Sequence, residues 1–227
     1  MSALELFPAS ALPQYPSVIP CVPHDIEAES FRTIAAELAA RGAEIPEDRR
    51  PVVFRAIHAS ADFDYAENLV FSPDALAVAQ DVLSRRPLIV IDTNMARAGI
   101  SARACARLGI ETHCFMADED VAAASRESGL TRAACAVDKA ARLFAGNGRP
   151  VLFVCGNAPT ALVRLRQLHD ARLFSPAFVV GVPVGFVNVV AAKELILRSG
   201  MPSIVARGRK GGSSVAAAIV NALLYRG

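Results

Sequence analysis

The residues best suited to chemistry stand together in one short stretch, RAIHASADFDY, at positions 55–65. The apolar run VVF that precedes this stretch indicates a helix. Helical spacing then places Arg55, His58 and Asp62 on one face, because residues at i, i+3 and i+7 are neighbours on a helix. A cation, an imidazole and a carboxylate side by side can be an ordinary solvated face. They can also form a site that exchanges a proton, because histidine is the side chain that titrates near neutral pH.

A second candidate is a hydroxyl on the preceding helix, which is predicted over residues 25–41. The inward stripe of this helix is Ile26, Ile34 and Leu38, and Ser30 belongs to the same stripe. A serine at such a position can donate a hydrogen bond to a carbonyl of its own helix. Alternatively, Ser30 points its hydroxyl into a cavity.

Two further helices are expected in the first third of the chain. The helix that carries His58 should begin near residues 46–48, where two acidic side chains suit the helix dipole. The next helix should reach about residue 84, with Ser72 as its N-cap and Pro73 in its first position.

The rest of the chain alternates short apolar runs with helical segments. Runs this short, rich in Val and Ile, are typical of buried parallel strands. The expected strands are 88–92, 112–115, 151–155, 177–181 and 203–206, and the expected helices lie near 94–99, 119–126, 131–145, 159–169, 188–198 and 212–224. This order predicts an α/β fold: an open, mostly parallel five-stranded sheet with helices on both faces, preceded by N-terminal helices.

The domain organisation follows from the distribution of proline. Residues 1–23 contain five prolines, which exclude a regular helix and predict an extended N-terminal arm. Several apolar side chains in this arm indicate that it lies on a surface of the protein or of a partner subunit. Residues 24–227 are expected to form a single α/β domain.

Ligands of open α/β sheets bind beyond the carboxyl ends of the strands, so the loops that follow the predicted strands are candidate sites. Three of these loops combine glycine with polar groups, which brings backbone N–H groups close to a ligand. The loop at 156–160 offers Asn157 and Thr160. The loop RGRKGGSS offers three cations and three glycines just before a helix; its candidates are Arg207, Gly208, Arg209, Gly211, Gly212 and Ser213.

The RGRKGGSS loop has the chemistry for binding an anion through N–H groups, helix dipole and cationic side chains. It can also be a basic surface turn. It does not match GxxxxGK[ST], and no GxGxxG follows any strand, so nothing specific indicates a nucleotide. Arg132 is a further anion-binding candidate, because Thr131 is a predicted N-cap and a cation in the first helical turn opposes the dipole.

Composition excludes several classes of protein. The net charge of +2 argues against a nucleic-acid partner, and no apolar run reaches the length of a membrane span. The five cysteines lack CxxC spacing, and the N-terminus lacks the layout of a signal peptide, so a cytoplasmic location with reduced thiols is expected. A metal site at His58, Asp62 and Asp64 is not expected, because no second His or Cys is near. The residues alone thus indicate an α/β enzyme or binding protein with a polyanionic ligand and one acid/base histidine.

Six blocks of this sequence, in this order, resemble the precorrin-8X methylmutase (precorrin isomerase) family. The blocks are HDIEAESFRTIAAEL, RAIHASADFDYAENLVFSPDAL, IDTNMARAGI, GNAPTAL, GVPVGFVNVV and RGRKGGSSVAAAIVNALL, and they cover roughly residues 24–224. The resemblance implies an isomerase of cobalamin biosynthesis that moves a methyl group from C-11 to C-12 of a tetrapyrrole. The implied substrate is precorrin-8X or cobalt-precorrin-8, and the product is hydrogenobyrinic or cobyrinic acid, with no cofactor.

The same resemblance implies a homodimer that binds the macrocycle near the subunit interface. It implies His58 as the catalytic proton donor, and Ser30, Arg55 and Arg132 as residues that contact the substrate. The many carboxylates of such a substrate suit the arginines and the glycine loops, and a methyl shift needs no nucleophile. One departure is Ala192, where several relatives have an acidic residue before the lysine. The N-terminal arm is also longer than in compact members.

Two alternatives compete with this interpretation. A tetrapyrrole-binding protein on the same scaffold would bind the ring without turning it over. An unrelated phosphoester or nucleotide enzyme would use the KGGSS sequence to bind phosphate and would not bind corrinoids.

Overall fold

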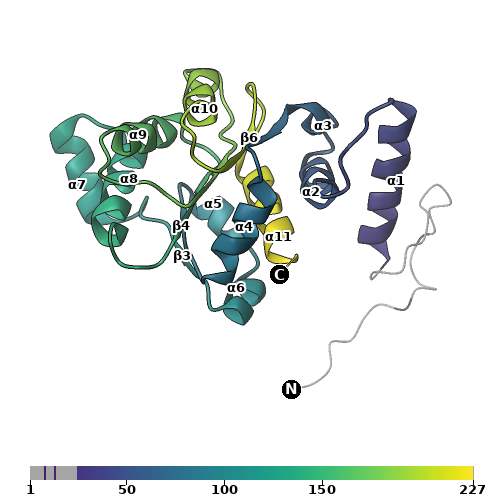
Figure 1. The fold of residues 1–227 in the computed structure, drawn as a ribbon, viewed down its shortest axis with the longest axis horizontal. Coiled ribbons are helices and arrows are strands. Elements are labelled where there is room, and N and C mark those ends of the chain that lie inside the picture. Colours follow the sequence, from purple (N-terminus) through teal and green to yellow (C-terminus); the bar gives the residue numbers. More distant parts are fainter. Residues whose placement is uncertain (1–7, 9–12, 14–24, 227) are drawn as a thin grey trace.

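The computed structural model describes residues 25–226 together with Pro8 and Pro13, so the expected N-terminal arm lies outside the described residues apart from these two prolines. The described part is an α/β fold built on one six-stranded sheet of order β1-β6-β5-β4-β2-β3 (Figure 1). The strands are β1 Leu69–Phe71, β2 Leu88–Ile91, β3 Glu111–His113, β4 Val151–Cys155, β5 Phe178–Gly181 and β6 Ser203–Ala206.

The fold class is confirmed, and the strand count was wrong by one. The five predicted strands are present and pair in parallel. The sixth strand, β1, pairs antiparallel with β6, with Leu69 opposite Ala206. Three residues at a sheet edge give too short a pattern to separate from the end of a helix. The apolar run LVF just before Ser72-Pro73 was the available indication.

Eleven helices surround the sheet in the described part of the chain. They are α1 Ile26–Ala40, α2 Arg50–Ser60, α3 Tyr65–Asn68, α4 Ala75–Ser84, α5 Asn94–Gly99, α6 Ala102–Leu108, α7 Glu119–Ser128, α8 Arg132–Phe144, α9 Pro159–Asp170, α10 Val189–Leu197 and α11 Ser213–Leu224. Helices α3 and α6 were not predicted from the sequence. Helix α6 begins after Ser101, whose side chain accepts a hydrogen bond from the N–H of Ala104.

Two predicted helix starts were wrong. Helix α2 begins at Arg50, not near residues 46–48, because Pro51 has no N–H and fits only the first turn. Ser72 does not cap α4; its hydroxyl accepts a 2.9 Å hydrogen bond from the N–H of Ser203 and so ties β1 to β6. Asp74, in a left-handed conformation with φ of 53°, precedes α4 instead.

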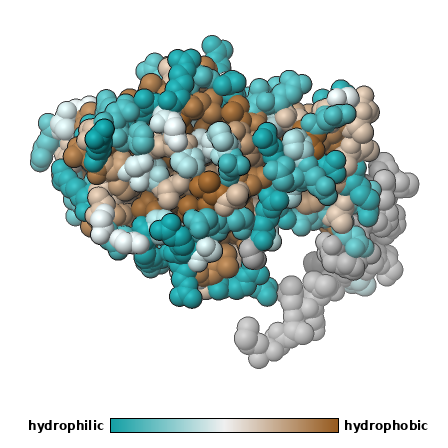
Figure 2. Space-filling model, in the orientation of Figure 1, coloured by the Kyte–Doolittle hydropathy of each residue, from teal (hydrophilic) through white to brown (hydrophobic). Residues whose placement is uncertain are grey.

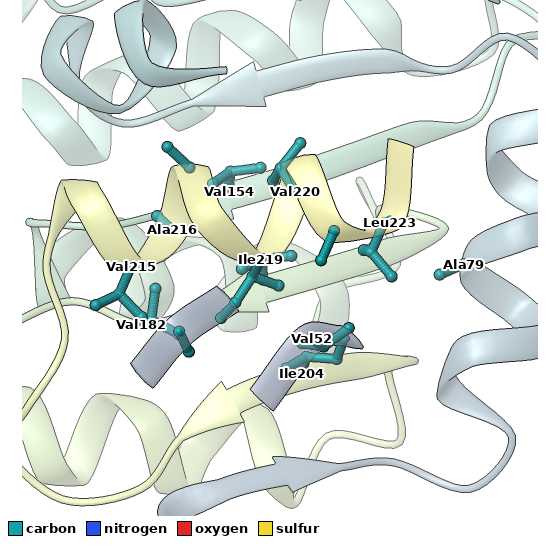
Figure 3. Close-up of a cluster of buried hydrophobic side chains, with 14 of the residues drawn as sticks. Val52, Ala79, Val154, Val182, Ile204, Val215, Ala216, Ile219, Val220 and Leu223 are labelled. Carbon is teal, nitrogen blue, oxygen red and sulfur yellow. The ribbon is translucent and has the colours of Figure 1, made fainter. Parts of the chain in front are cut away.

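Two apolar cores cover the two faces of the sheet. Helices α8, α9 and α10 pack on one face. On the other face α11 lies against β4 and β5, and it also packs against α2, α4 and α5. Figure 3 shows Ile219, Val220 and Leu223 of α11 among side chains of the sheet and of α2. Helix α11 is therefore the element that joins the sheet to α2, and α1 in turn packs on α2 at the edge of the molecule (Figure 1).

In the part of the chain that is described, every helix is too short or too polar to cross a membrane.

Candidate active site

The loops that follow β2, β4 and β6 meet at the start of α11. Thr93 is the second residue after β2. Its Oγ1 lies 2.9 Å from the Oγ of Ser213, the first residue of α11. Gly156, after β4, lies so close to this turn that a Cβ there would be 3.1 Å from the Cα of Ser213. The three loops thus form a continuous row along the carboxyl edge of the parallel strands, where ligands of such sheets bind.

The loop after β4 is held by a buried carboxylate. The backbone N–H groups of Gly156, Asn157 and Ala158 donate hydrogen bonds of 2.8, 2.8 and 2.7 Å to Asp92, whose residue is only 4% exposed. The expectation that these N–H groups face a ligand was therefore wrong, because a carboxylate of the protein already accepts them. Sequence reasoning assigned no role to Asp92, although a carboxylate that ends the apolar strand LIVI was a visible indication.

Asn157 and Thr160 lie on this row. The side chain of Asn157 is exposed, and the Oγ1 of Thr160 lies 2.8 Å from the Oγ1 of Thr131. Thr131 is the N-cap of α8, as predicted, because its side chain accepts a hydrogen bond from the N–H of Ala134. Arg132 follows as an exposed first residue of α8 and makes no ion pair within the described residues. The Thr131–Thr160 contact therefore places this arginine beside the β4 loop.

The three cations after β6 differ in their partners. Lys210 Nζ lies 2.7 Å from a carboxylate oxygen of Asp62 and 2.6 Å from one of Asp64, and these hydrogen bonds raise the pKa of Lys210. Arg207 Nε lies 2.9 Å from Glu194 Oε1. Arg209 has its guanidinium 5.6 Å from the centre of the ring of Phe186. Within the described residues Arg209 has no carboxylate partner, so its charge is available to an anion.

Asp62 therefore serves a purpose that the sequence did not indicate. Helix α2 ends at Ser60, and Ala61 is left-handed with φ of 53°, so Asp62 does not continue the face of His58. Burial raises the pKa of Asp62, but hydrogen bonds from Lys210 and from the N–H of Asp64 outweigh this effect and leave the pKa below its ordinary value. The carboxylate is thus charged and ties the end of α2 to the loop after β6.

The glycines of this loop allow the backbone to pack tightly. A Cβ on Gly211 would lie 2.1 Å from the carbonyl oxygen of Val182, and the N–H of Gly212 donates a 2.8 Å hydrogen bond to the same oxygen. Gly208 is left-handed, with φ of 85°. These glycines bring the loop against the end of β5. The sequence suggested that the N–H of Gly212 faces a ligand, but this N–H donates its hydrogen bond to Val182 of the protein.

Lys193 of α10 holds the loop after β6 from below. Its residue is fully buried, and its Nζ donates hydrogen bonds of 2.8 and 2.7 Å to the carbonyl oxygens of Gly208 and Lys210. Burial lowers the pKa of Lys193 to about 8. The burial of Lys193 could not be predicted from the sequence, because nothing in the spacing of residues along α10 distinguishes this lysine from an exposed one.

His58 lies apart from the row, on the side of α2 that faces α1. Together with Ser30 it lines a cavity of about 330 Å³ between the two helices. The ring of His58 is exposed and meets the ring of Phe31 edge-on, with 5.6 Å between centres. Within the described residues neither of its ring nitrogens makes a hydrogen bond. An accessible imidazole without a protein partner can exchange a proton with a bound molecule.

Ser30 both bonds to its own helix and lies in the cavity, which were the two alternatives for this residue. Its hydroxyl donates a 2.8 Å hydrogen bond to the carbonyl of Ile26, and the residue also lines the cavity with His58. The predicted inward stripe was correct for Ile34 and Leu38 and wrong for Ile26, which is 48% exposed and lines the same cavity.

Arg55 does not line the cavity. Its Nη1 lies 2.7 Å from Glu27 Oε1, and its guanidinium lies 5.4 Å and 4.8 Å from the ring centres of Phe31 and Tyr225. Arg55 thus joins α1, α2 and the end of α11, and its charge is already balanced by Glu27.

The candidate residues therefore form two groups. Ser30 and His58 lie in the cavity between α1 and α2, and the remaining residues other than Arg55 lie on the strand-edge row. The ion pairs of Lys210 connect the two groups. No cluster of three metal-binding side chains occurs among the described residues.

Apolar side chains reach the surface near the row. Met95, Phe186 and Val187 are 76%, 83% and 78% exposed, and Val190 of α10 is 42% exposed. Figure 2 shows apolar side chains at the surface in several places on this face, including the region of α10. The row thus combines cations with apolar surface, which suits a ligand that is both hydrophobic and anionic.

The fold and site together define an α/β protein with exposed arginines along the strand edge and a separate cavity lined by a histidine. The chain belongs to the precorrin-8X methylmutase family, whose model matches residues 25–226. It is therefore an isomerase, an intramolecular transferase that shifts a methyl group in cobalamin biosynthesis, and the family resemblance seen in the sequence is confirmed.

Individual relatives agree with this assignment. The chain is 43% identical over 214 residues to the cobalt-precorrin-8 methylmutase of Salmonella typhimurium, covering 89% of this chain and 95% of the relative. It is 38% identical to the precorrin-8X methylmutase of Pseudomonas aeruginosa, covering 86% and 91%. The solved structure of precorrin-8x methyl mutase from Thermus thermophilus matches with a TM-score of 0.78 and 35% identity, covering 88% and 96%. These matches argue against an unrelated phosphoester or nucleotide enzyme.

Proposed function

We propose that the protein moves the methyl group of precorrin-8X or cobalt-precorrin-8 from C-11 to C-12, with His58 as the proton donor. The observation that carries this proposal is the environment of His58. Its imidazole is exposed beside a cavity of about 330 Å³ and makes no hydrogen bond within the described residues. A histidine in this setting is free to protonate a ligand and to take the proton back.

The chemistry requires little more than this proton. Protonation of the conjugated ring makes it electron-poor and favours a [1,5]-sigmatropic shift, in which the bond from the methyl group to C-11 breaks as the bond to C-12 forms. Substrate and product are isomers, so the proton that His58 donates returns to it and no cofactor is consumed. General acid catalysis of this kind typically contributes about 10²- to 10⁴-fold in rate.

The strand-edge row is proposed to hold the acetate and propionate groups of the ring. Arg132 and Arg209 are the leading candidates, because both are exposed and neither has a carboxylate partner within the described residues. Arg55 and Arg207 are expected to contribute less, since Glu27 and Glu194 already pair with them. The residues proposed to frame the substrate between these cations are Asn157, Thr160, Gly208, Gly211, Gly212 and Ser213.

We infer that the working enzyme is a homodimer. The cavity of about 330 Å³ lies at the lower end of the usual range for ligand cavities, and no residue of the strand-edge row lines it. One tetrapyrrole that reaches both His58 and an Arg132 is most easily accommodated when the two residues come from different subunits. The exposed Phe186 and Val187 supply apolar surface for such an interface.

We also propose a cytoplasmic location. The cysteines at 105, 114, 135 and 155 are unpaired thiols, which is the ordinary state of cysteine in a reducing compartment.

The test of the catalytic proposal is His58→Ala, with His169→Ala as the matched control. His169 lies on α9, where its Nδ1 is 2.9 Å from Ser175 Oγ, remote from the cavity. We expect His58→Ala to bind hydrogenobyrinic acid, seen as a coloured protein peak in gel filtration, and to lose turnover of precorrin-8X and cobalt-precorrin-8. Near wild-type turnover by His58→Ala would refute the proton-donor role. A wild-type protein that binds the ring without converting either substrate would support the binding-only alternative.

The homodimer is tested by light scattering alongside activity over a dilution series. We expect specific activity to fall as the dimer dissociates. A monomer that stays fully active at nanomolar concentration would contradict the shared site.

A further inference from the structure

Two charged side chains are buried beneath the strand-edge loops. Asp92 is 4% exposed and Lys193 is 0% exposed, and they are the only charged residues buried in the described part of the chain. Burying a charge is costly unless it is paired or fully hydrogen-bonded. Neither residue forms an ion pair within the described residues, so backbone groups must provide the compensation.

Asp92 is stabilised chiefly by backbone donors of the loop after β4. Its Oδ1 accepts from Gly156, and its Oδ2 accepts from Asn157 and Ala158, all at 2.8 Å or less. The thiol of Cys155 adds a 3.3 Å contact to Oδ2, and burial raises the pKa of this thiol well above its ordinary value, so it remains a donor. A carboxylate with three N–H donors fixes the loop in one conformation.

Lys193 shows the opposite arrangement. Its ammonium donates to the carbonyl oxygens of Gly208 and Lys210, which turns both carbonyls inward. The residue between them, Arg209, is exposed and lies over Phe186. The lysine thus fixes the two peptide groups that flank the most available cation of the loop.

We propose that Asp92 and Lys193 are a pair of positioning residues, which set the geometry of the loops at 156–158 and 208–210 for the substrate. This inference rests on the proposed function, since these loops are taken as the binding site for the carboxylates of the ring. Asp92 occupies the N–H groups of its loop, so the loop presents the side chain of Asn157 to the ligand. Lys193 occupies the carbonyls of its loop, so that loop presents Arg209.

The experiment compares Asp92→Asn and Lys193→Met with matched controls on α8. Asp138→Asn removes a carboxylate that pairs with Arg164, and Lys139→Met removes an ammonium that pairs with carboxylates of α7 and the turn before it. Both controls repeat the chemical change away from the two loops. Hydrogen exchange reports loop order without substrate, and steady-state kinetics with precorrin-8X report KM and kcat separately.

We expect each test variant to expose its own loop. Asp92→Asn places an amide NH₂ against N–H donors, so the amides of 156–158 should exchange faster. Lys193→Met should speed exchange at Gly185 and Gly212, whose N–H groups bond to Arg209 and Val182. KM should rise about tenfold with kcat changed less than about twofold, because uniform substrate binding is lost while His58 is untouched. The controls should change neither exchange at these loops nor KM.

Unchanged hydrogen exchange in both test variants would overturn the proposal. Faster exchange with an unchanged KM would also overturn it, and so would a decrease in kcat without a rise in KM. If Lys193→Met does not fold, Lys193→Gln, which keeps a donor on a shorter side chain, takes its place under the same criteria. A wild-type protein that does not turn over the tetrapyrrole would instead refute the proposed function, while hydrogen exchange would still decide whether the two residues position the loops.

Discussion

Replacing Gly211 by alanine tests whether the loop after β6 must keep its present path. A Cβ at this position would lie 2.1 Å from the carbonyl oxygen of Val182 and 2.8 Å from that of Pro183, whereas ordinary contact begins at 3.4 Å. Both obstructing atoms belong to the backbone at the end of β5, so no side chain can rotate away. The loop must therefore move by more than about 1 Å at this point, and overpacking of this kind typically costs about 1–3 kcal/mol of stability.

The effect on activity should exceed the effect on stability. Misplacement of a binding group by about 1 Å can cost about 10²-fold in rate. We therefore expect Gly211→Ala to fold, to melt several degrees lower, and to lose about 10²-fold in kcat/KM for precorrin-8X. Thermal melting and steady-state kinetics on the same preparation measure both quantities.

The matched control is Gly208→Ala in the same loop. Gly208 has φ of 85° and nothing within 4 Å of the added Cβ, so alanine there meets conformational strain but no clash. A left-handed conformation costs alanine roughly 1–2 kcal/mol, so the two variants should lose similar stability. Gly211→Ala should nevertheless lose much more activity. Equal activity of the two variants, or near wild-type turnover of Gly211→Ala, would refute the argument that the clash with Val182 displaces the binding loop.

Three further predictions concern charged residues. Arg132→Ala should weaken corrinoid binding by about 1.5–3 kcal/mol, roughly 10- to 100-fold in Kd. The melting temperature should stay unchanged or rise, because a cation in the first turn opposes the helix dipole. A lower melting temperature with unchanged affinity would make Arg132 a structural residue. Lys210→Met should lower kcat/KM by a larger free-energy equivalent than it lowers stability, because it removes the ion pairs to the half-buried Asp62 and the exposed Asp64 and so releases the end of α2 from the loop. Equal turnover of variant and wild type would contradict this. Lys193 should make a contribution to stability that rises with pH between about 8 and 10.5, because its folded pKa lies below its ordinary value of 10.5 and the unfolded chain binds the proton more tightly in that interval. In urea unfolding across this range, the free energy of unfolding of wild type should rise relative to that of Lys193→Met, while buried thiols with a raised pKa act in both proteins; a constant difference would contradict this.

The sequence predicted the regular part of the fold well. Strands that are buried on both faces are continuous apolar runs, and β4 and β6 were predicted to the residue for this reason. The antiparallel β1 was missed because a three-residue edge strand acquires its identity from pairing with β6. The cap at Ser72 was wrong for a similar reason: its hydroxyl had a better partner in Ser203, 131 residues away, which local spacing cannot reveal.

The sequence indicated which residues are candidates for the site, but it did not indicate which other residues they contact. His58, Ser30 and Arg132 stay predicted site residues, and Arg132 lies in the first turn of α8 as expected. Which cations are neutralised could not be predicted, because Arg55 and Lys210 meet carboxylates from distant segments. For the same reason the sequence could not show that a buried carboxylate and a buried ammonium hold the loops.

Helix α11 connects the two groups of candidate residues within one subunit. It begins in the turn of Gly211 to Ser213, on the strand-edge row, and then packs along α2, which carries His58. Residues of α11 such as Ile219 are fully buried, and a helix buried on this scale cannot move without carrying its neighbours. The ion pairs of Lys210 add a second connection at the end of α2. The geometry of the strand-edge loops and the position of the proposed proton donor are therefore connected by one rigid element, and a substitution that displaces the start of α11 itself, such as Gly211→Ala, should affect both.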